Sequence, residues 1–592
     1  MKKISTILII FTLGFSQLLQ AQYEPKSIYL QQPDTIIDHL LESADFWKKS
    51  IDREDGGFYS FVNRDGTPNL TTRKSFVQCS RHAYGFSRAF MLSGDETYLD
   101  YAEHALQFVY DHGWDDQHLG WLFSSDKVGN PSPPYGGGWN PNNEKWSFQQ
   151  HYNLLGIAAM VEATRDSLHT AWLEQGIQTN DNFLWDGRSR VRGYFNTADV
   201  DWNNKRGKGF TPTVDAVTTW VLAKTLLDDQ VGDENRLLQI TGHIIDYLYA
   251  SMFLPEVKIG FAEVYNNNWE IDESSNGAST GHVIKTAWCL ARAYMFDPKP
   301  EYLEAAQFMI DDIMDKGGYD EVNGGLWGNI NWATNSVTKR KNHWMLEQGV
   351  TGGLMNYFIA EDQADRDQNL RMADGCMEFY MEHFIDEEYG ECYLETDGNG
   401  NITRDSKSDP FKGGYHNIEL AYLVYVYGNL FLHQAPISLY YRFDAQPETR
   451  TFKMTPLAIR DDLLTISSVE LDGINYSNFE SKDRLLTLPP NTYGIFKVTY
   501  NLEEVIVSAK ELKTLPAINV YPNPVQDYLF VSNLPTQASI SIFNLEGKPF
   551  PLHSGRAMAL GTPIDVRALP AGFYVLSVQE GGRISQQKFV KY

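Results

Sequence analysis

The sequence has few cysteines and a shortage of basic residues. Only 4 of its 592 residues are cysteine, and they lie far apart with no C-x-x-C spacing, which argues against a disulfide framework and against structural zinc. Lys and Arg together number 50 against 76 Asp and Glu, which gives a formal net charge of -26. Because this excess of negative charge repels phosphate backbones, we do not expect the protein to bind nucleic acid.

Motifs for nucleotide cofactors and catalytic zinc are also missing. The sequence has no G-x-G-x-x-G, Walker or H-E-x-x-H motif, so we expect neither a cofactor nor a metal ion. Beyond the N-terminus no run approaches about 18 consecutive apolar residues, so we expect no membrane span. The chain does have 42% hydrophobic and 13% aromatic residues, which is ample for a folded core.

The first residues have the pattern of a secretory signal peptide. Two lysines near the start are followed by an apolar run from Ile4 to Leu19 and by a small residue, Ala21, at its exit. A basic start, a short apolar stretch and a small residue before a polar segment are typical of a removable leader. We therefore assign residues 1–21 to a signal peptide and expect the mature protein to be exported.

Residues 22–435 contain an internal repeat. A short turn, with Gly beside an aromatic or apolar residue, recurs six times, and successive glycines are 63, 73, 67, 65 and 65 residues apart. The glycines are Gly57, Gly120, Gly193, Gly260, Gly325 and Gly390. Units of about 66 residues leave room for two helices each, which is the signature of a repeat architecture.

Between these turns, apolar residues recur at helical spacing. The clearest segments are Ser80–Leu92, Leu99–Tyr110, Gln149–Thr164, Asp215–Leu227, Ile284–Tyr294 and Leu303–Met314. Six helical hairpins close naturally into a ring, so we predict a mainly α catalytic domain, an (α/α)6 barrel with the Gly-containing turns on one face. A one-dimensional helical solenoid is the alternative.

The last part of the chain alternates in the manner of β-strands, so we expect two small all-β domains after the barrel. In residues 436–510, a β-rich spacer or packing domain, the segments are Ser438–Phe443, Leu463–Leu471 and Tyr493–Tyr500. In residues 511–592 they are Tyr528–Val531, Ile540–Phe543 and Phe573–Val578.

Residues 511–592 resemble the type A sorting domain of the Bacteroidetes type IX secretion system. The segments that carry the resemblance are Asn519–Val525, Phe543–Gly547, Leu569–Tyr574 and Lys588–Tyr592. The resemblance implies that the type IX secretion machinery is a partner of this protein and that the protein is secreted or attached to the cell surface. A plain β-sandwich accessory domain is the alternative.

Two histidines occupy matching places in the repeat. His282 follows the fourth Gly-containing turn and His416 follows the sixth, and each stands at the start of a predicted helix. Both should therefore face the loop-rich mouth of the barrel. Because imidazole titrates near neutral pH, the pair is suited to proton transfer in either direction. Structural hydrogen bonding at a helix start is the alternative role.

The helical region, over roughly residues 35–430, resembles the N-acylglucosamine 2-epimerase family. The resemblance is carried by Arg81 in F-V-Q-C-S-R-H, by G-H-x-I-x-x-x-W at His282, by H-W-M-L-E-Q with Trp344 and Glu347, and by G-G-Y-H at His416. It implies an (α/α)6 barrel in which the two histidines act as an acid/base pair on a carbon next to a carbonyl group. It also implies that Arg81 polarises the substrate oxygen.

Two departures from the family pattern change the charge of this site. Val283 and Lys285 stand where the family has acidic residues after the first histidine, and Thr211–Asp215 stands where the family has a third histidine. Basic residues also gather at 205–208 and 339–341, on the expected mouth, where they suit an anionic sugar such as a uronate or a sulfated sugar. The expected substrate-binding residues are Lys285, Trp344, Glu347, Tyr415, Arg206 and Arg340. Solvated surface charge is the alternative for the two basic clusters.

A uronic acid would give the histidine pair a defined reaction. One histidine would remove the proton at C5, which the carboxylate acidifies, while Arg81 with Lys285 or the basic loops stabilises the enolate-like intermediate. The other histidine would protonate the departing 4-hydroxyl, giving water and a 4,5-unsaturated uronate, so that the enzyme would be a lyase. The whole chain resembles the oligosaccharide dehydratases of marine flavobacteria, which implies glucuronate or iduronate at the non-reducing end of ulvan oligosaccharides as the substrate.

Three other functions fit the sequence. The first is a sugar 2-epimerase or aldose–ketose isomerase, in which the same histidines act at the reducing end. The second is a glycoside hydrolase that uses Asp55, Asp116, Asp320 and Asp386, the acidic residues ahead of four Gly-containing turns, although such residues also serve as turn caps. The third is a surface glycan-binding protein without catalysis.

Overall fold

The computed structural model describes residues 22–71, 73–132, 144–227, 231–456, 463–503, 519–532, 539–544, 549–550, 564–580 and 583–592. The expected signal peptide, residues 1–21, lies outside these ranges. The chain divides into two compact units, Met1–Glu503 and Glu504–Tyr592, which are described separately.

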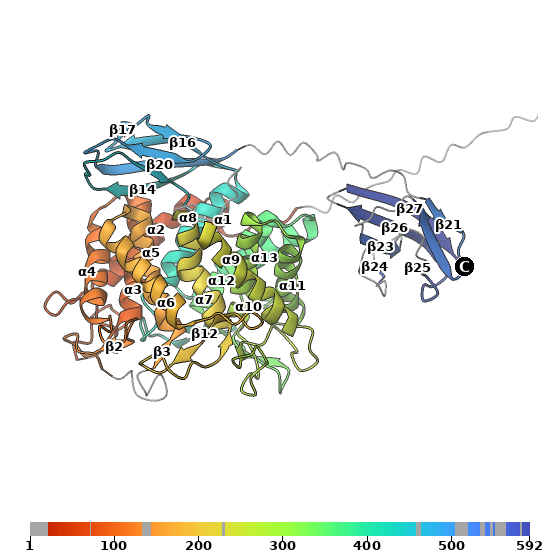
Figure 1. Ribbon diagram of the computed structural model, residues 1–592, viewed down its shortest axis with the longest axis horizontal. Helices are drawn as coiled ribbons and strands as arrows, with labels where there is room; N and C mark the ends of the chain where they lie inside the picture. The colour runs from red at the N-terminus through yellow and green to blue at the C-terminus, as the bar shows by residue number, and fades with distance from the viewer. Residues whose placement is uncertain are drawn as a thin grey trace, which may run out of the picture. The chain divides into compact units, whose positions relative to one another are not determined.

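The first unit is dominated by helices that alternate between an outer and an inner ring (Figure 1). After two short turns, α1 (Ile28–Gln31) and η1 (Pro33–Thr35), the outer helices are α2 (Ile36–Lys48), α4 (Thr97–His112), α6 (Ser167–Phe183), α9 with η3 (Val231–His243, Ile244–Tyr249), α11 (Pro300–Asp315) and α13 (Gln363–His383). The inner helices are α3 (Phe76–Ser93), α5 (Ser147–Thr164), α7 with η2 and α8 (Phe210–Ala216, Val217–Val221, Leu222–Leu227), α10 (Thr280–Phe296), α12 (His343–Ile359) and α14 with η4 (His416–Leu423, Val424–Leu432).

The inner helices contact one another in sequence order, and the last of them, α14, packs against the first, α3. Closure of the ring confirms the predicted (α/α)6 barrel and excludes an open solenoid. Small residues make the close contacts: a Cβ atom on Gly85 of α3 would lie 2.0 Å from the carbonyl oxygen of Gly414, just ahead of α14. Inner helices such as α3 are buried on almost every side, whereas outer helices such as α4 bury only one face.

The connections that enter the inner helices are long and carry the Gly-containing turns. In each of four units, two successive residues adopt left-handed backbone angles, at 56–57, 119–120, 324–325 and 390–391. An isolated antiparallel bridge closes each of these turns, for example Ile51 to Phe58 and Ile385 to Cys392. By this register the sixth repeat is centred on Glu391 rather than Gly390. The repeat predicted from sequence is therefore confirmed with a one-residue correction.

Short strands pair within and between the loops at this end of the barrel. The pairs are β1–β2 (Lys74–Ser75, Ser124–Ser125), β3–β6 (Lys145–Trp146, Thr197–Ala198), β4–β5 (Trp185–Asp186, Gly193–Tyr194), β7–β8 (Lys208–Gly209, Val264–Tyr265), β9–β10 (Ile330–Asn331, Ser336–Val337) and the three strands β11–β12–β13 (Arg340–Asn342, Glu395–Asp397, Ile402–Arg404). Strands β1, β3, β7 and β11 run directly into inner helices, so the paired loops fix where those helices begin.

A buried Asp–Lys pair pins most of these loops. Lys74 Nζ donates to Asp52 Oδ2 at 2.8 Å and to the carbonyl oxygen of Gly56 at 2.7 Å. The same arrangement recurs in other units, as Lys145 with Asp115, Lys208 with Asp186, Lys341 with Asp320 and Lys407 with Asp386. Each lysine thus links a Gly-containing turn to the chain segment that leads into the next inner helix. Asp320 and Asp386 therefore have a structural role. In the first two units the aspartate paired with the lysine is Asp52 or Asp115, rather than Asp55 or Asp116.

In the described part of residues 437–502, seven strands form two sheets, ordered β14-β20-β16-β17 and β15-β19-β18. They are β14 (Ile437–Phe443), β15 (Arg450–Lys453), β16 (Leu464–Leu471), β17 (Ile474–Asn475), β18 (Phe479–Glu480), β19 (Leu485–Leu488) and β20 (Gly494–Leu502). Their buried side chains belong to the same hydrophobic cluster as the barrel core. Tyr440 packs on Gly94, at a short connection between helices, so this β domain covers the barrel end opposite the long loops (Figure 1).

The second unit is a small β structure with its own core. Its sheets are β21-β22-β25 (Asn519–Tyr521, Tyr528–Ser532, Ile564–Asp565) and β24-β23-β26-β27 (Pro549–Phe550, Ser539–Asn544, Gly572–Glu580, Arg583–Lys591). Leu529, Leu576 and Val578 are among the fully buried residues between them. Across the described part of the chain, no helix is long and apolar enough to cross a membrane.

Candidate functional site

A cavity of about 380 Å³ opens at the end of the barrel that carries the long loops. Its wall is formed by Arg81, Phe148, Tyr152, Thr211, Asp215, His282, Lys285, Asn342, His343, Trp344, Leu394, Arg404, Asp409, Phe411, Lys412 and His416. Most of these residues lie in the first two turns of inner helices. The ring of helices therefore brings together side chains that are more than 300 residues apart in the sequence.

His282 lies at the start of α10, where the sequence predicted it. Its Nδ1 lies 3.0 Å from Oε1 of Glu263, which also accepts a hydrogen bond from the backbone N–H of Ser279. The imidazole stacks on Phe210, with ring centroids 3.9 Å apart, and remains 29% exposed. The carboxylate and the aromatic ring hold the imidazole in place, so Nε2 is the nitrogen available to a ligand in the cavity.

His416 is the first residue of α14 and is held in the same way. Its Nδ1 lies 3.2 Å from Oε2 of Glu347, and its side chain is 12% exposed. Burial, followed by the nearby positive charge of Arg81, lowers the pKa of His416 well below its ordinary value. The imidazole is therefore neutral across the physiological pH range and suited to accept a proton at Nε2.

Trp344 joins the two histidines. Its ring centroid lies 5.2 Å from that of His282 and 6.1 Å from that of His416. Trp344 is the second residue of α12, where the side chain of Asn342 accepts a hydrogen bond from the Trp344 backbone N–H at 3.4 Å. A half-buried tryptophan between two imidazoles offers an apolar face against which a sugar ring can pack.

Arg81 lies in the second turn of α3 and reaches the cavity between aromatic rings. Its guanidinium carbon lies 4.3 Å from the ring centroid of Tyr152 and 5.2 Å from that of Tyr415. One guanidinium nitrogen donates to the carbonyl oxygen of Phe411, and the buried Nε has no hydrogen-bond partner among the described residues. Arg81 also forms no ion pair in this part of the chain, so its positive charge is available to a ligand.

Lys285 lies on the cavity wall, but its charge is already paired. Nζ donates to Asp215 Oδ1 at 2.7 Å and to the hydroxyl of Tyr152 at 3.2 Å. The two departures from the family pattern, at Lys285 and at the segment that ends in Asp215, therefore compensate each other. Sequence reasoning treated Lys285 as a free cation because it could not place α7 next to α10.

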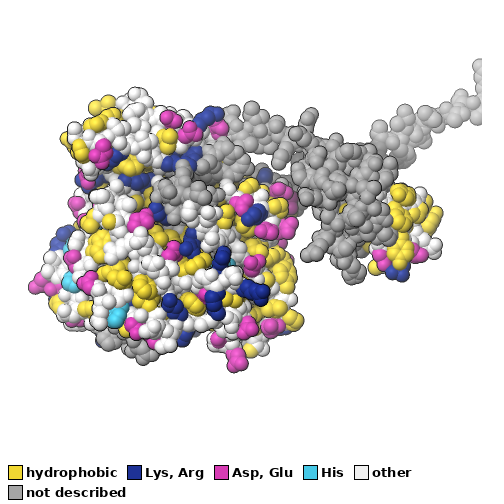
Figure 2. All heavy atoms as spheres, viewed as in Figure 1, with side chains coloured by type: hydrophobic (Ala, Val, Ile, Leu, Met, Phe, Trp, Pro, Cys, Tyr) yellow, Lys and Arg dark blue, Asp and Glu magenta, His cyan; other side chains and the backbone are white. Residues whose placement is uncertain are grey.

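Other expected substrate-binding residues lie away from the cavity surface. Arg206 pairs with Glu144 at 2.7 Å and Arg340 with Glu395 at 3.1 Å, and neither lines the cavity. Glu347 and Tyr415 are buried behind His416 and Arg81 and do not line the cavity, so they support its wall. Lys208 and Lys341, from the same two basic clusters, are also buried in Asp–Lys pairs. The expected positively charged mouth of the barrel is therefore not observed, because acidic partners neutralise these basic residues. On the face drawn in Figure 2, basic and acidic side chains are interspersed.

Several cavity residues were missed by the sequence analysis. Glu263 holds His282, and its signal was an acidic residue three positions after the fourth repeat glycine. Arg404, on the β12–β13 hairpin, lines the cavity and forms no ion pair among the described residues. Asp409 accepts backbone hydrogen bonds from Phe411 and Lys412 and shapes the loop ahead of α14. These loop residues have no helical periodicity, so only the folded loops reveal them.

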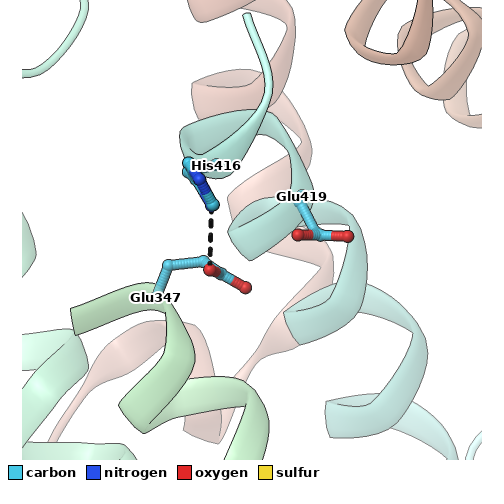
Figure 3. Close-up of side chains that lie close together, drawn as sticks. All are labelled: Glu347, His416 and Glu419. Carbon is cyan, nitrogen blue, oxygen red and sulfur yellow. Dashed lines mark hydrogen bonds and ion pairs between the residues drawn. The ribbon is translucent and has the colours of Figure 1, made fainter. Parts of the chain in front are cut away.

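One group of side chains is close enough to be considered for a metal ion. Within the described ranges, a single set of three or more acidic, histidine or cysteine ligand atoms lies within 4.8 Å: Glu347, His416 and Glu419 (Figure 3). Glu347 already accepts hydrogen bonds from Thr351 and Gln348, and Glu419 accepts one from Tyr84. Because these donors are neutral, they are compatible with buried carboxyl groups that hold a proton instead of a metal ion.

Comparison with known proteins agrees with this architecture. Residues 56–419 match the N-acylglucosamine 2-epimerase family model, and residues 519–592 match the secretion system C-terminal sorting domain. The chain is 24% identical over 396 residues to cellobiose 2-epimerase of Ruminococcus albus, covering 64% of this chain and 94% of that protein. It is 20% identical over 404 residues to D-mannose isomerase of Marinomonas mediterranea, covering 65% and 95%.

Solved structures show the same barrel. Cellobiose 2-epimerase from Bacillus thermoamylovorans superposes with a TM-score of 0.57 at 18% identity, covering 66% of this chain and 99% of that one. A D-mannose isomerase gives 0.59 at 18% identity, covering 68% and 99%. The sorting domain shows that the protein is exported by the type IX system to the cell surface or the medium. Because the family match spans more than half of the sequence, the chain belongs to the N-acylglucosamine 2-epimerase family and is a carbohydrate-processing enzyme of that family.

Proposed function

We propose that the cavity moves a proton at a carbon next to a carbonyl or carboxylate group of a sugar, with His282 and His416 as the two proton carriers. The observation that carries the proposal is their matched geometry. Each imidazole uses Nδ1 to contact a carboxylate, Glu263 or Glu347, and Trp344 lies between them. A carboxylate on Nδ1 fixes the tautomer and leaves Nε2 as the base.

The first candidate reaction is epimerisation or aldose–ketose isomerisation at the reducing end of a sugar. It is supported by the family match and by relatives that are cellobiose 2-epimerases and a mannose isomerase. One histidine takes the proton from C2 and Arg81 stabilises the enolate oxygen. A histidine then returns a proton to C2 in epimerisation, or to C1 in isomerisation, where a hydroxyl proton also moves from O2 to O1. The step conserves atoms, since the proton removed is replaced.

The second candidate is dehydration of a uronate at the non-reducing end of an ulvan-type oligosaccharide. It is favoured by the charge of the wall: Lys285 and Lys412 are paired with Asp215 and Glu391, whereas Arg81 and Arg404 form no ion pair among the described residues. Two available guanidinium groups suit a carboxylate and a second anionic group on the same oligosaccharide. One histidine removes the C5 proton and the other donates a proton to the departing 4-hydroxyl, which leaves as water.

A single experiment in heavy water separates the two candidates. The purified protein is incubated in D₂O with cellobiose and, separately, with a glucuronate-ended ulvan oligosaccharide, and the products are followed by NMR and mass spectrometry. Epimerisation or isomerisation incorporates deuterium into the reducing-end sugar of cellobiose. Dehydration removes one water from the uronate oligosaccharide and creates an alkene signal. If neither sugar exchanges a proton or loses water, the proposal fails.

A further inference from the structure

A second layer of carboxyl groups lies behind His416. α14 carries His416 and, one turn later, Glu419, while the carboxylate of Glu347 on α12 is directed toward α14 (Figure 3). Ligand atoms of these three residues lie within 4.8 Å of one another. Glu347 is 0% exposed and Glu419 is 6% exposed. The two carboxyl groups are therefore neighbours in a buried environment, and only Glu347 contacts the imidazole.

The partners of these carboxyl groups are almost all neutral. Thr351 Oγ1 donates to Glu347 Oε1 at 3.1 Å, and the hydroxyl of Tyr84 donates to Glu419 Oε1 at 3.0 Å. Oε2 of Glu419 has no hydrogen-bond partner among the described residues. In the same part of the chain, neither carboxyl group forms an ion pair with Lys or Arg. Lys285 and Arg292 act on the pair through space, but neither forms an ion pair with Glu347 or Glu419 in the described ranges.

Two buried carboxylates at this separation cannot both be ionised at neutral pH, so the pair retains one proton. Burial, and next the charge of Glu419, raises the pKa of Glu347 well above its ordinary value. Burial also raises the pKa of Glu419, against the hydrogen bonds from Tyr415 and Tyr84 that lower it. The retained proton is thus placed beside a histidine whose own protonation state matters for catalysis.

We propose that Glu419 is a positioning residue that acts through Glu347 on His416: it takes up the proton that the two carboxyl groups share, so that Glu347 is ionised whenever His416 is protonated. This inference rests on the proposed function of His416 as a proton carrier. In the resting state the three groups hold two protons. When Nε2 accepts a proton from the substrate they hold three: two on the imidazolium and one on Glu419, with Glu347 ionised against Nδ1.

Six other charged or titratable groups around the three residues are the same in every variant used to test this proposal, so their influence on the pKa of His416 stays constant. They are Arg81, Lys285, Arg292, His343, Lys412 and Tyr415, and Tyr84 is altered only in the second variant. Positive charges among them favour neutral His416. An ionised Glu347 is the group that opposes them, and Glu419 decides how readily Glu347 ionises.

The test is the titration of the His416 ring, followed by NMR in protein labelled at the histidine ring and assigned with a His416→Asn variant. Glu419→Gln preserves size but cannot hold a negative charge, so Glu347 no longer competes with a second carboxylate. We expect the His416 titration to move upward by about one pH unit or more, with the acid limb of kcat/KM moving the same way. Glu347→Gln should move it downward.

Tyr84→Phe is the second variant, because it removes a donor to Glu419 without removing a carboxyl group. It makes Glu419 hold its proton more readily and should shift His416 upward by a smaller amount. Thermal unfolding verifies that each variant is folded. The proposal is overturned if folded Glu419→Gln and Tyr84→Phe titrate as the wild type does. It is also overturned if EDTA abolishes the difference, since the three groups would then act through a bound metal.

This readout is independent of turnover. The NMR titration uses protein without substrate, so a shift in Glu419→Gln supports the coupling whatever reaction the enzyme performs. Conversely, full activity of His416→Asn would remove the proposed function and leave the measured coupling intact.

Discussion

At the scale of single residues, the chemistry depends on which nitrogen of each histidine is free. Glu263 and Glu347 contact Nδ1 of His282 and His416 at 3.0 and 3.2 Å, so both rings present Nε2. The carboxylates come from different places, a loop before α10 and the first turns of α12. Equivalent geometry from different elements indicates that the tautomer, rather than a particular backbone motif, is what the site requires.

Replacing either histidine should remove the proton carrier and leave the fold intact. We expect His282→Asn and His416→Asn each to lower kcat by at least about 100-fold, the usual contribution of a general acid or base. Deuterium incorporation or water loss from the substrate, measured at saturating concentration, is the readout. His118→Asn, outside the cavity, is the matched control and should retain activity. A histidine variant with unchanged kcat would show that its ring is not the proton carrier.

The buried pair of Lys285 and Asp215 should matter for stability more than for charge recognition. Their side chains are 2.7 Å apart and almost completely buried. Lys285→Met leaves Asp215 buried without its partner, so the free energy of unfolding should fall by about 3–5 kcal/mol. Urea denaturation measures this change.

The double variant Lys285→Met/Asp215→Leu is the control for that prediction. Because it removes both charges, it should recover most of the lost stability. If the single variant is as stable as the wild type, the ion pair does not hold α7 to α10.

At the scale of elements, the repeated Asp–Lys pair explains how long loops are ordered without disulfides. Each lysine reaches back to the preceding Gly-containing turn, as Lys74 does to Asp52 and Gly56. Four of the five lie just ahead of an inner helix, and Lys407 lies farther ahead of α14. The sequence signal was present in the spacing of acidic residues and lysines. Sequence alone suggests turn caps and basic clusters at these positions, because the partners are 21 to 30 residues apart and their contact requires the loop to fold back.

These pairs should make the barrel sensitive to acid. Although burial opposes its ionisation, hydrogen bonds from Lys74 and from backbone N–H groups hold the pKa of Asp52 at about 2. A carboxyl group whose pKa is lower in the folded state stabilises the protein above its unfolded pKa of about 4 and loses that effect as the pH falls toward 2. We expect the denaturant concentration at the unfolding midpoint of the wild type to decrease as the pH is lowered from about 4 to 2.

Asp52→Asn should lower stability at neutral pH by about 3–5 kcal/mol, because it leaves the Lys74 ammonium buried without its carboxylate. Its midpoint should also depend less on pH between about 4 and 2. Asp116→Asn, at an exposed position of the second turn, should behave as the wild type does. A wild-type midpoint that is flat down to pH 2 would contradict the role assigned to these pairs.

At the scale of the whole molecule, export and catalysis are assigned to separate units. The barrel and the β domain that follows it share one hydrophobic cluster, whereas the sorting domain has its own. Leu439, Tyr441 and Phe443 of β14 are buried against this shared core. The β domain is therefore part of the same folded unit as the barrel. Its alternating sequence predicted strands but could not show that they pack against the barrel.

Two truncations should behave differently. Protein ending at Glu503 should keep its unfolding temperature and activity, because it retains the complete first unit, but should no longer be exported by a type IX host. Protein ending at Pro436 should be insoluble or unfold at a much lower temperature, because the end of the barrel loses its apolar cover. Calorimetry and cell fractionation are the measurements. Equal stability of the two proteins would show that the β domain is only a spacer.

The sequence by itself determined the repeat, the helical class and the sorting domain, and it predicted Arg81, His282, His416 and Trp344, which the structure places around one cavity. Periodicity and motif spacing are local properties, so they survive without coordinates. Only the tertiary structure decided which charges are available. Lys285, Arg206 and Lys341 are compensated by Asp215, Glu144 and Asp320, which lie 21 to 70 residues away. Electrostatics depends on distance in space, and that distance is set by closure of the barrel.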